Sequence, residues 1–193
     1  MSDRCLKIVL IDDEFPIADN KVSTLLARNG ATGQQALWQV GSVITAPQQL
    51  LTHYVDCLLY CGHDLYCIKD AETAIDFFKS EARHEIDVAV LDIMIPPGRV
   101  KFDPKGVCST LMYWCLVYQA GFGRRRTLPI AILTNVSDNN IFAELRQNYL
   151  LYRKEFPQIC APEIWIESKA KLARAWVANL ETWIATGKRN SGF

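Results

Sequence analysis

Five polar side chains follow apolar runs of the sequence, at positions where buried strands would end. They are Asp12, Asp13, Asp92, Thr134 and Lys169. Carboxylates gathered at one place repel one another unless a cation lies among them, and oxygen ligands without histidine or cysteine suit Mg²⁺. A lysine ammonium and a threonine hydroxyl opposite such a metal would complete a cradle for a phosphoryl group. The combination therefore predicts phosphoryl transfer, with one aspartate as the nucleophile.

Each of these residues has a simpler explanation when it is considered alone. Asp12 and Asp13 could interact with the dipole of a following helix, and a single aspartate after a strand is usually a turn residue. Most lysines are solvated surface residues, so Lys169 alone indicates little. The functional interpretation rests on the combination: polar side chains of these types end several separate apolar runs.

The elements that would position these residues are strands alternating with helices. Continuous apolar runs, typical of strands buried on both faces, lie at 5–12, 64–69, 87–92, 128–135 and 163–168. Helices are expected at 15–30, 70–85, 106–121, 141–155 and 170–186. Asp70 is the expected N-cap of the second helix. The last helix is expected to bury Leu172, Trp176, Leu180, Trp183 and Ile184. This alternation predicts an α/β fold with a parallel sheet, in which sites form beyond the carboxyl ends of the strands.

Composition narrows the classes of partner. The chain has 193 residues, with 21 basic and 21 acidic side chains, so net charge favours neither nucleic acid nor an anionic membrane. The first residues form neither a signal peptide nor a membrane span. Seven cysteines, mostly inside apolar stretches, indicate reduced thiols and a cytoplasmic protein.

Four stretches resemble the receiver domain of response regulators in two-component signalling. They are IVLIDDEFPI, VAVLDIMIPPG, AILTN and ESK, and the resemblance runs from about residue 5 to residue 186. It implies a flavodoxin-like, doubly wound parallel sheet of five strands. It also implies that Asp92 accepts a phosphoryl group from a histidine kinase or a phosphotransfer protein.

The resemblance assigns the remaining site residues as well. Asp12 and Asp13 would hold Mg²⁺ together with Asp92, and Asp13 would be the direct ligand. The backbone carbonyl of Met94 would also face the metal. Thr134 would hydrogen-bond the phosphoryl group, and Lys169 would pair with it.

Three positions depart from the receiver pattern. Ala170 follows the strand-end lysine where the family usually has proline, and Asn135 stands where a small residue is usual. Ile166 occupies the position of the usual switch tyrosine or phenylalanine. Its neighbour Trp165 is expected to point to the other face of the strand. The relay from threonine to an aromatic residue is therefore in question.

The chain is interpreted as one receiver-like domain, 1–193, with an inserted segment at 31–63. An added helix is expected from Pro47 to Cys61, with an apolar surface wider than docking on one sheet face requires. That surface would bind an output partner, mediate a homodimer, or be buried against the core and the helix near 141–155. His53, Cys57 and Cys61 share a stripe of this helix, although core cysteines are the commoner explanation.

The predicted function is a stand-alone phosphoryl acceptor that signals through a phosphorylation-dependent interaction with a downstream protein. Its chemistry would be limited to Mg²⁺-dependent self-phosphorylation and self-dephosphorylation. The alternative is a receiver-fold binding module that does not switch. A phosphatase acting on small molecules is disfavoured, because such enzymes generally need a second acid where this chain has Met94.

Overall fold

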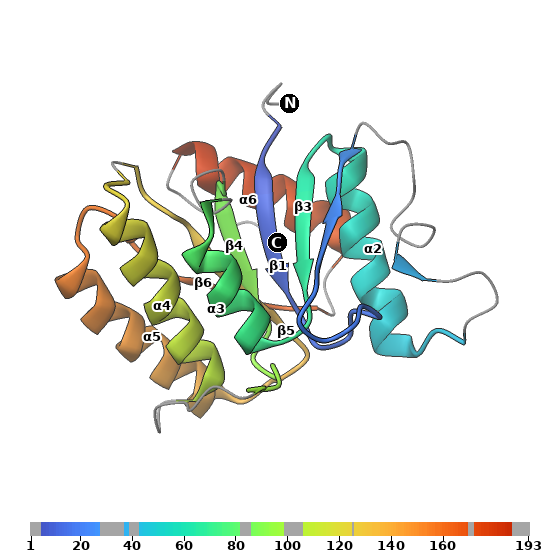
Figure 1. The fold of residues 1–193 in the computed structure, drawn as a ribbon, viewed down its shortest axis with the longest axis horizontal. Coiled ribbons are helices and arrows are strands. Elements are labelled where there is room, and N and C mark those ends of the chain that lie inside the picture. The colour runs from blue at the N-terminus through green and yellow to red at the C-terminus, as the bar shows by residue number, and fades with distance from the viewer. Residues whose placement is uncertain are drawn as a thin grey trace.

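A central sheet with helices on both faces forms the molecule (Figure 1). The computed structural model describes residues 5–27, 37–38, 43–81, 86–98, 106–124, 126–169 and 172–186. In these residues the sheet has six strands. In spatial order they are β2 (Val22–Leu25), β3 (Asp64–Ile68), β1 (Lys7–Ile11), β4 (Val88–Leu91), β5 (Ile130–Thr134) and β6 (Trp165–Ser168). The α/β fold is confirmed, whereas the expected count of five strands was wrong because β2 adds a sixth.

The strands pair in parallel except for β2, which runs antiparallel to β3. The parallel strands follow the order β3-β1-β4-β5-β6, which is compatible with a flavodoxin-like, doubly wound sheet. All residues of β4 and β5 are buried, as continuous apolar runs predict for strands covered on both faces.

The helices of the described residues divide between the two faces of the sheet. They are α2 (Ala46–Tyr60), α3 (Ala71–Lys79), α4 (Val107–Gly121), α5 (Asn139–Glu155) and α6 (Ala173–Thr186). Ile8 and Leu10 of β1 pack in one core cluster with α2 and α6. Val9 and Ile11 pack in the other cluster with α3, α4 and α5. The alternation along β1 thus separates two cores, as the period of a strand requires.

The expected helix at 15–30 was wrong over the described residues 15–27. Asn20 has a φ of 61°, which a helix interior does not accept, and β2 follows directly. Val22 and Thr24 are β-branched residues that favour a strand, and β2 pairs with the free edge of β3. Residues 28–30 lie outside the described part of the chain. Tertiary pairing at the sheet edge therefore decided the conformation of this segment.

The helix expected from Pro47 to Cys61 is α2, and it begins with a capping box formed by Thr45 and Gln48. It lies between β1 and β3 in the chain, so it serves as a crossover helix of the sheet. Its side chains Leu51, Tyr54, Val55 and Leu58 are fully buried. The apolar side of α2 is therefore buried in the core beside α6 and not beside the helix near 141–155, whereas binding of an output partner or a second copy stays a prediction. Most of the 31–45 part of the predicted insertion lies outside the described residues.

The remaining expected helices and strands form close to their predicted bounds, except that the helix expected at 70–85 ends at Lys79, where Ser80 is its C-cap. The last helix begins at Ala173, so Leu172 precedes it and is largely exposed, contrary to expectation. Trp176, Leu180 and Trp183 are buried as expected, and Ile184 is partly buried.

Asp70 links α3 to the loop that follows Asp13, which yields a prediction about stability. Its Oδ1 accepts the Thr73 N–H at 2.8 Å, and its Oδ2 accepts the Thr73 hydroxyl at 2.8 Å and the Asn20 N–H at 3.3 Å. Asp70→Ala removes the cap and leaves the two buried donors of Thr73 without this acceptor, so we expect a loss of about 1–2 kcal/mol or more. Asp76→Ala, on the exposed side of α3 beside Lys79, should cost under about 0.5 kcal/mol. Urea denaturation measures both, and equal losses would contradict the structural role of Asp70.

Candidate functional site

The site lies at the carboxyl edge of the sheet, where the backbone continues the strand ladder by one residue. The Asp12 N–H donates to the Ile68 carbonyl at 2.9 Å, and the Asp92 N–H donates to the Ile11 carbonyl at 2.8 Å. The Lys169 N–H donates to the Thr134 carbonyl at 2.9 Å. Because these bonds are extensions of parallel pairing, the three side chains begin at the same edge of the sheet, Asp12 and Asp92 on adjacent strands and Lys169 beyond β5.

A single ammonium group joins two of the carboxylates. Lys169 Nζ lies 2.6 Å from Asp12 Oδ2 and 2.6 Å from Asp92 Oδ2. All three side chains are almost fully buried. Charge-assisted bonds of this length in a dry environment are strong, and a lysine without them would be costly to bury. Lys169 is therefore a central component of the site and not a solvated surface residue.

The second oxygen of each paired carboxylate is held by the backbone. Asp12 Oδ1 accepts the Glu14 N–H at 3.1 Å, and Asp92 Oδ1 accepts the Ile93 N–H. Both carboxylates therefore have a fixed orientation, with one oxygen on an amide and the other on Lys169.

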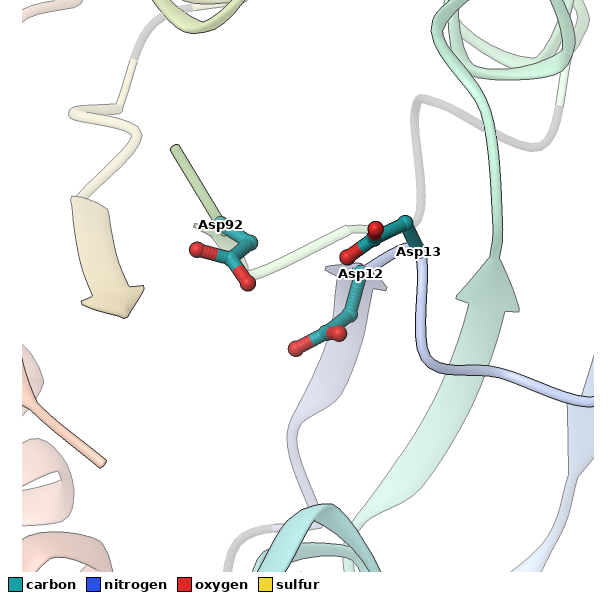
Figure 2. A group of neighbouring side chains, drawn as sticks. All are labelled: Asp12, Asp13 and Asp92. Atoms are coloured by element: carbon teal, nitrogen blue, oxygen red, sulfur yellow. The ribbon is translucent and has the colours of Figure 1, made fainter. Parts of the chain in front are cut away.

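Asp13 completes an acidic group with Asp12 and Asp92 (Figure 2). Each residue offers one oxygen, and these atoms lie within 4.8 Å of one another. Asp13 is only partly buried, so it faces the open side of the group. Among the described residues, this is the one group of three or more histidine, cysteine or acidic side chains close enough to share a metal. A purely carboxylate donor set fits Mg²⁺, as the sequence indicated, whereas the stripe of His53, Cys57 and Cys61 forms no such group.

Thr134 is fully buried at the end of β5, and its hydroxyl oxygen accepts the Val136 N–H at 3.2 Å. The Met94 side chain is largely exposed, and the contact of its carbonyl with a metal stays a prediction. Asn135 is exposed. Thus the predicted residues share one edge of the sheet, and Lys169, Asp12 and Asp92 are in direct contact.

The neighbours of Lys169 along β6 point as the alternation of a strand predicts. Ile166 is buried in the cluster with α3, α4 and α5, whereas Trp165 is buried in the opposite cluster and stacks on Trp176. Ala170 lies outside the described residues. The position at which the resemblance to receiver domains implies a switch aromatic is therefore occupied by a buried isoleucine.

Burial and charge shift the pKa values of the acidic group. Burial is the main reason that the pKa of Asp12 is raised to about 6. The ammonium of Lys169 opposes this rise only in part, and the negative charge of Asp92 adds to it. Burial and then Asp92 also raise the pKa of Asp13. For Lys169, burial alone would lower the pKa, but Asp12 and Asp92 outweigh it and raise the pKa of the ammonium. The site therefore keeps its internal cation and binds a proton more readily than isolated aspartates do.

Two contacts of Lys169 were not predicted from the sequence. Its ion pair with Asp12 was missed, since Asp12 was interpreted only as a metal ligand. The hydroxyl of Tyr54 donates to the Lys169 carbonyl at 3.0 Å, whereas the sequence indicated only an apolar helix face. The polar tip of a tyrosine inside an apolar stripe was the signal that could have indicated a buried partner.

No protein-family model and no curated protein matches this chain. Among solved structures, it is similar to one described as a trimeric coiled-coil segment of yeast Spc42, amino acids 181–211, fused to another structure. The identity is 12%, the TM-score is 0.52, and the match covers 96% of this chain and 82% of that one. At this identity the similarity concerns the fold alone. Within the described residues, none of the helices combines the length and apolar character that crossing a membrane requires.

The raised pKa of Asp12 makes stability depend on pH in the absence of Mg²⁺. The folded state holds this proton up to about pH 6, whereas an unfolded aspartate loses it near pH 4. The folded state thus binds more protons between these values, so the free energy of unfolding should fall as pH rises from about 4 to 6. Asp12→Asn should flatten this slope in urea denaturation across that range. Identical slopes in the wild type and the variant would contradict the assignment.

Proposed function

We propose that this protein is a receiver-like phosphoryl acceptor, in which Asp92 takes a phosphoryl group from a histidine kinase or a phosphotransfer protein. The observation that carries the proposal is the bridge from Lys169 Nζ to Asp92 and Asp12, with Asp13 alongside. A phosphoryl group on Asp92 would bring strongly accepting, negatively charged oxygens to this edge. The ammonium is already in place to pair with them.

In the proposed reaction, a carboxylate oxygen of Asp92 attacks the phosphorus of a phosphohistidine. The P–N bond breaks, its electron pair returns to the imidazole, and an acyl phosphate forms on Asp92. Lys169 and the Thr134 hydroxyl would stabilise the phosphoryl oxygens. Asp12, Asp13 and Asp92 would hold Mg²⁺, which when bound neutralises charge on the transferred group.

Output would consist of a phosphorylation-dependent interaction with a downstream protein or with a second copy of the chain, in the cytoplasm. Enzymatic activity would be limited to self-phosphorylation from small phosphodonors and self-dephosphorylation. A small-molecule phosphatase is less well supported, because the residue two positions after Asp92 is the exposed Met94 and not an acid.

A specific observation favours the second candidate, a binding module that does not switch. Ile166 is 8% exposed and packed in the core at the position of the usual switch aromatic. An isoleucine held there lacks the aromatic ring that would report a change at Thr134. A protein that is phosphorylated without any change in partner binding would support this candidate.

Phosphorylation is tested on the full chain with acetyl phosphate and Mg²⁺, followed by intact-mass spectrometry. We expect the mass of one phosphoryl group to be added, and Asp92→Asn should abolish the gain. Asp87→Asn is a matched control, since Asp87 is a buried aspartate at the opposite end of β4, paired with Arg126 at 2.9 Å. It should be phosphorylated like the wild type.

Two results would overturn the proposal. One is a wild-type chain that gains no phosphoryl group from acetyl phosphate or from a phosphorylated phosphotransfer protein. The other is a gain that persists in Asp92→Asn, which would place the acceptor elsewhere.

Mg²⁺ binding gives a separate prediction on thermal stability. Mg²⁺ should raise the melting temperature by mass action, with about 2.7 kcal/mol of stabilisation when its concentration is roughly 100 times Kd. Asp13→Asn removes a charged ligand and should abolish the response, although it relieves repulsion in the metal-free protein. Differential scanning fluorimetry with Mg²⁺ titration measures this. An unchanged response in the variant would exclude Asp13 as a ligand.

A further inference from the structure

The backbone of Lys169 is held on both sides of its Cα atom by different parts of the molecule. Its N–H donates to the carbonyl of Thr134, at 2.9 Å, in continuation of the ladder between β5 and β6. Its carbonyl accepts the hydroxyl of Tyr54, at 3.0 Å, from α2. A lysine side chain is long and flexible, so its ammonium is well placed only if the backbone from which it extends is fixed.

Tyr54 is itself fixed by its surroundings. Its side chain is fully buried, and its ring makes an edge contact with Trp176 of α6, with centroids 5.5 Å apart. Trp176 stacks on Trp165 of β6, with centroids 5.4 Å apart. Burial, followed by the charge of Glu167, raises the pKa of Tyr54 to about 12, so its hydroxyl remains a donor. The hydroxyl therefore has a defined position relative to α2, α6 and β6.

The residue that follows Lys169 makes the hydrogen bond from Tyr54 more important for holding the backbone. Receiver domains usually carry a proline after the strand-end lysine, and this chain has Ala170 there. Alanine restricts the backbone far less than proline does. The bond from Tyr54 supplies a restraint from α2, at the carbonyl that directly precedes Ala170 in the sequence.

We infer that Tyr54 is the positioning residue of the site: its hydroxyl fixes the Lys169 carbonyl and thereby holds the ammonium between Asp12 and Asp92. The effect on phosphoryl transfer rests on the proposed function, whereas the effect on the position of Lys169 does not. Tyr54→Phe is the informative variant, because it removes the hydroxyl and keeps the ring on Trp176.

The chain offers a matched control in Tyr149. This residue is also buried, and its hydroxyl donates to the backbone carbonyl of Ala161 at 3.1 Å. It belongs to α5 and lies in the core cluster on the opposite face of the sheet from Tyr54. Tyr149→Phe therefore loses the same kind of bond at a similar depth, away from the site.

The first experiment observes Lys169 directly, without Mg²⁺ or a phosphodonor. Protein labelled with ¹⁵N at its lysines is examined by NMR, and the Lys169 ammonium signal is assigned with Lys169→Met. A buried, doubly ion-paired ammonium should exchange its protons slowly and give a separate signal in the wild type. We expect Tyr54→Phe to broaden or remove this signal and Tyr149→Phe to retain it.

The second experiment measures the initial rate of phosphorylation by acetyl phosphate with Mg²⁺. Loss of one hydrogen bond that acts on positioning should lower the rate of Tyr54→Phe by about fivefold. Tyr149→Phe should keep the wild-type rate. Urea denaturation checks that the two variants lose comparable stability, so that a difference in rate does not reflect unfolding.

The outcomes separate the two proposals. An unaltered Lys169 signal in folded Tyr54→Phe, or equal effects of both variants on it, would overturn the role of Tyr54. A wild-type protein without a protected Lys169 signal would overturn it too, because the ion pair that it positions would be missing. A selective loss of the signal in a chain that is never phosphorylated would support the positioning role and reject the proposed function.

Discussion

The buried ammonium of Lys169 between Asp12 and Asp92 is the interaction on which the rest of the site depends. Two carboxylates at this depth would repel each other, and removing one partner from a buried ion pair typically costs about 3–5 kcal/mol. The three side chains follow β1, β4 and β6, so their ion pairs connect β6 to two strands that are not its neighbours in the sheet. The same charge arrangement leaves a net negative group with Asp13, which favours a cation from solution. The stability of this edge and the proposed binding of Mg²⁺ would thus both depend on one lysine.

The helices α2 and α6 cover one face of the sheet and support the ion-paired site from that side. α2 and α6 cover the face to which Trp165 and Trp176 contribute, and Tyr54 reaches from there to the backbone at the site. The loop after Asp13 is in turn tied to α3 through Asn20 and Asp70. The acidic group therefore has supports from both layers of helices, although its own residues all come from strand ends.

Local patterns predicted most of the fold, and strand-end chemistry predicted most of the site. Continuous apolar runs placed the parallel strands, and Asp70 was identified as an N-cap because capping depends on neighbours in sequence. The convergence of Asp12, Asp13 and Asp92 followed from the geometry of parallel strands. Failures arose where distant contacts decided the outcome. Residues 22–25 complete their strand hydrogen bonds with β3, which lies far along the chain, and the bond from Tyr54 to Lys169 also joins distant positions.

The antiparallel strand β2 also constrains the order in which the chain can assemble. It pairs with β3, which follows it in sequence only after α2, so β2 cannot complete its hydrogen bonds until the chain has passed through α2 and formed β3. Pairing across an intervening helix closes a long loop, and such non-local contacts form late and slow folding. Once in place, β2 is itself the edge strand of the sheet, and its four residues offer another chain a shorter template for pairing than the five residues of β3 would. The segment that leads away from the acidic residues therefore shortens the exposed edge of the sheet, and it does so only after β3 has formed.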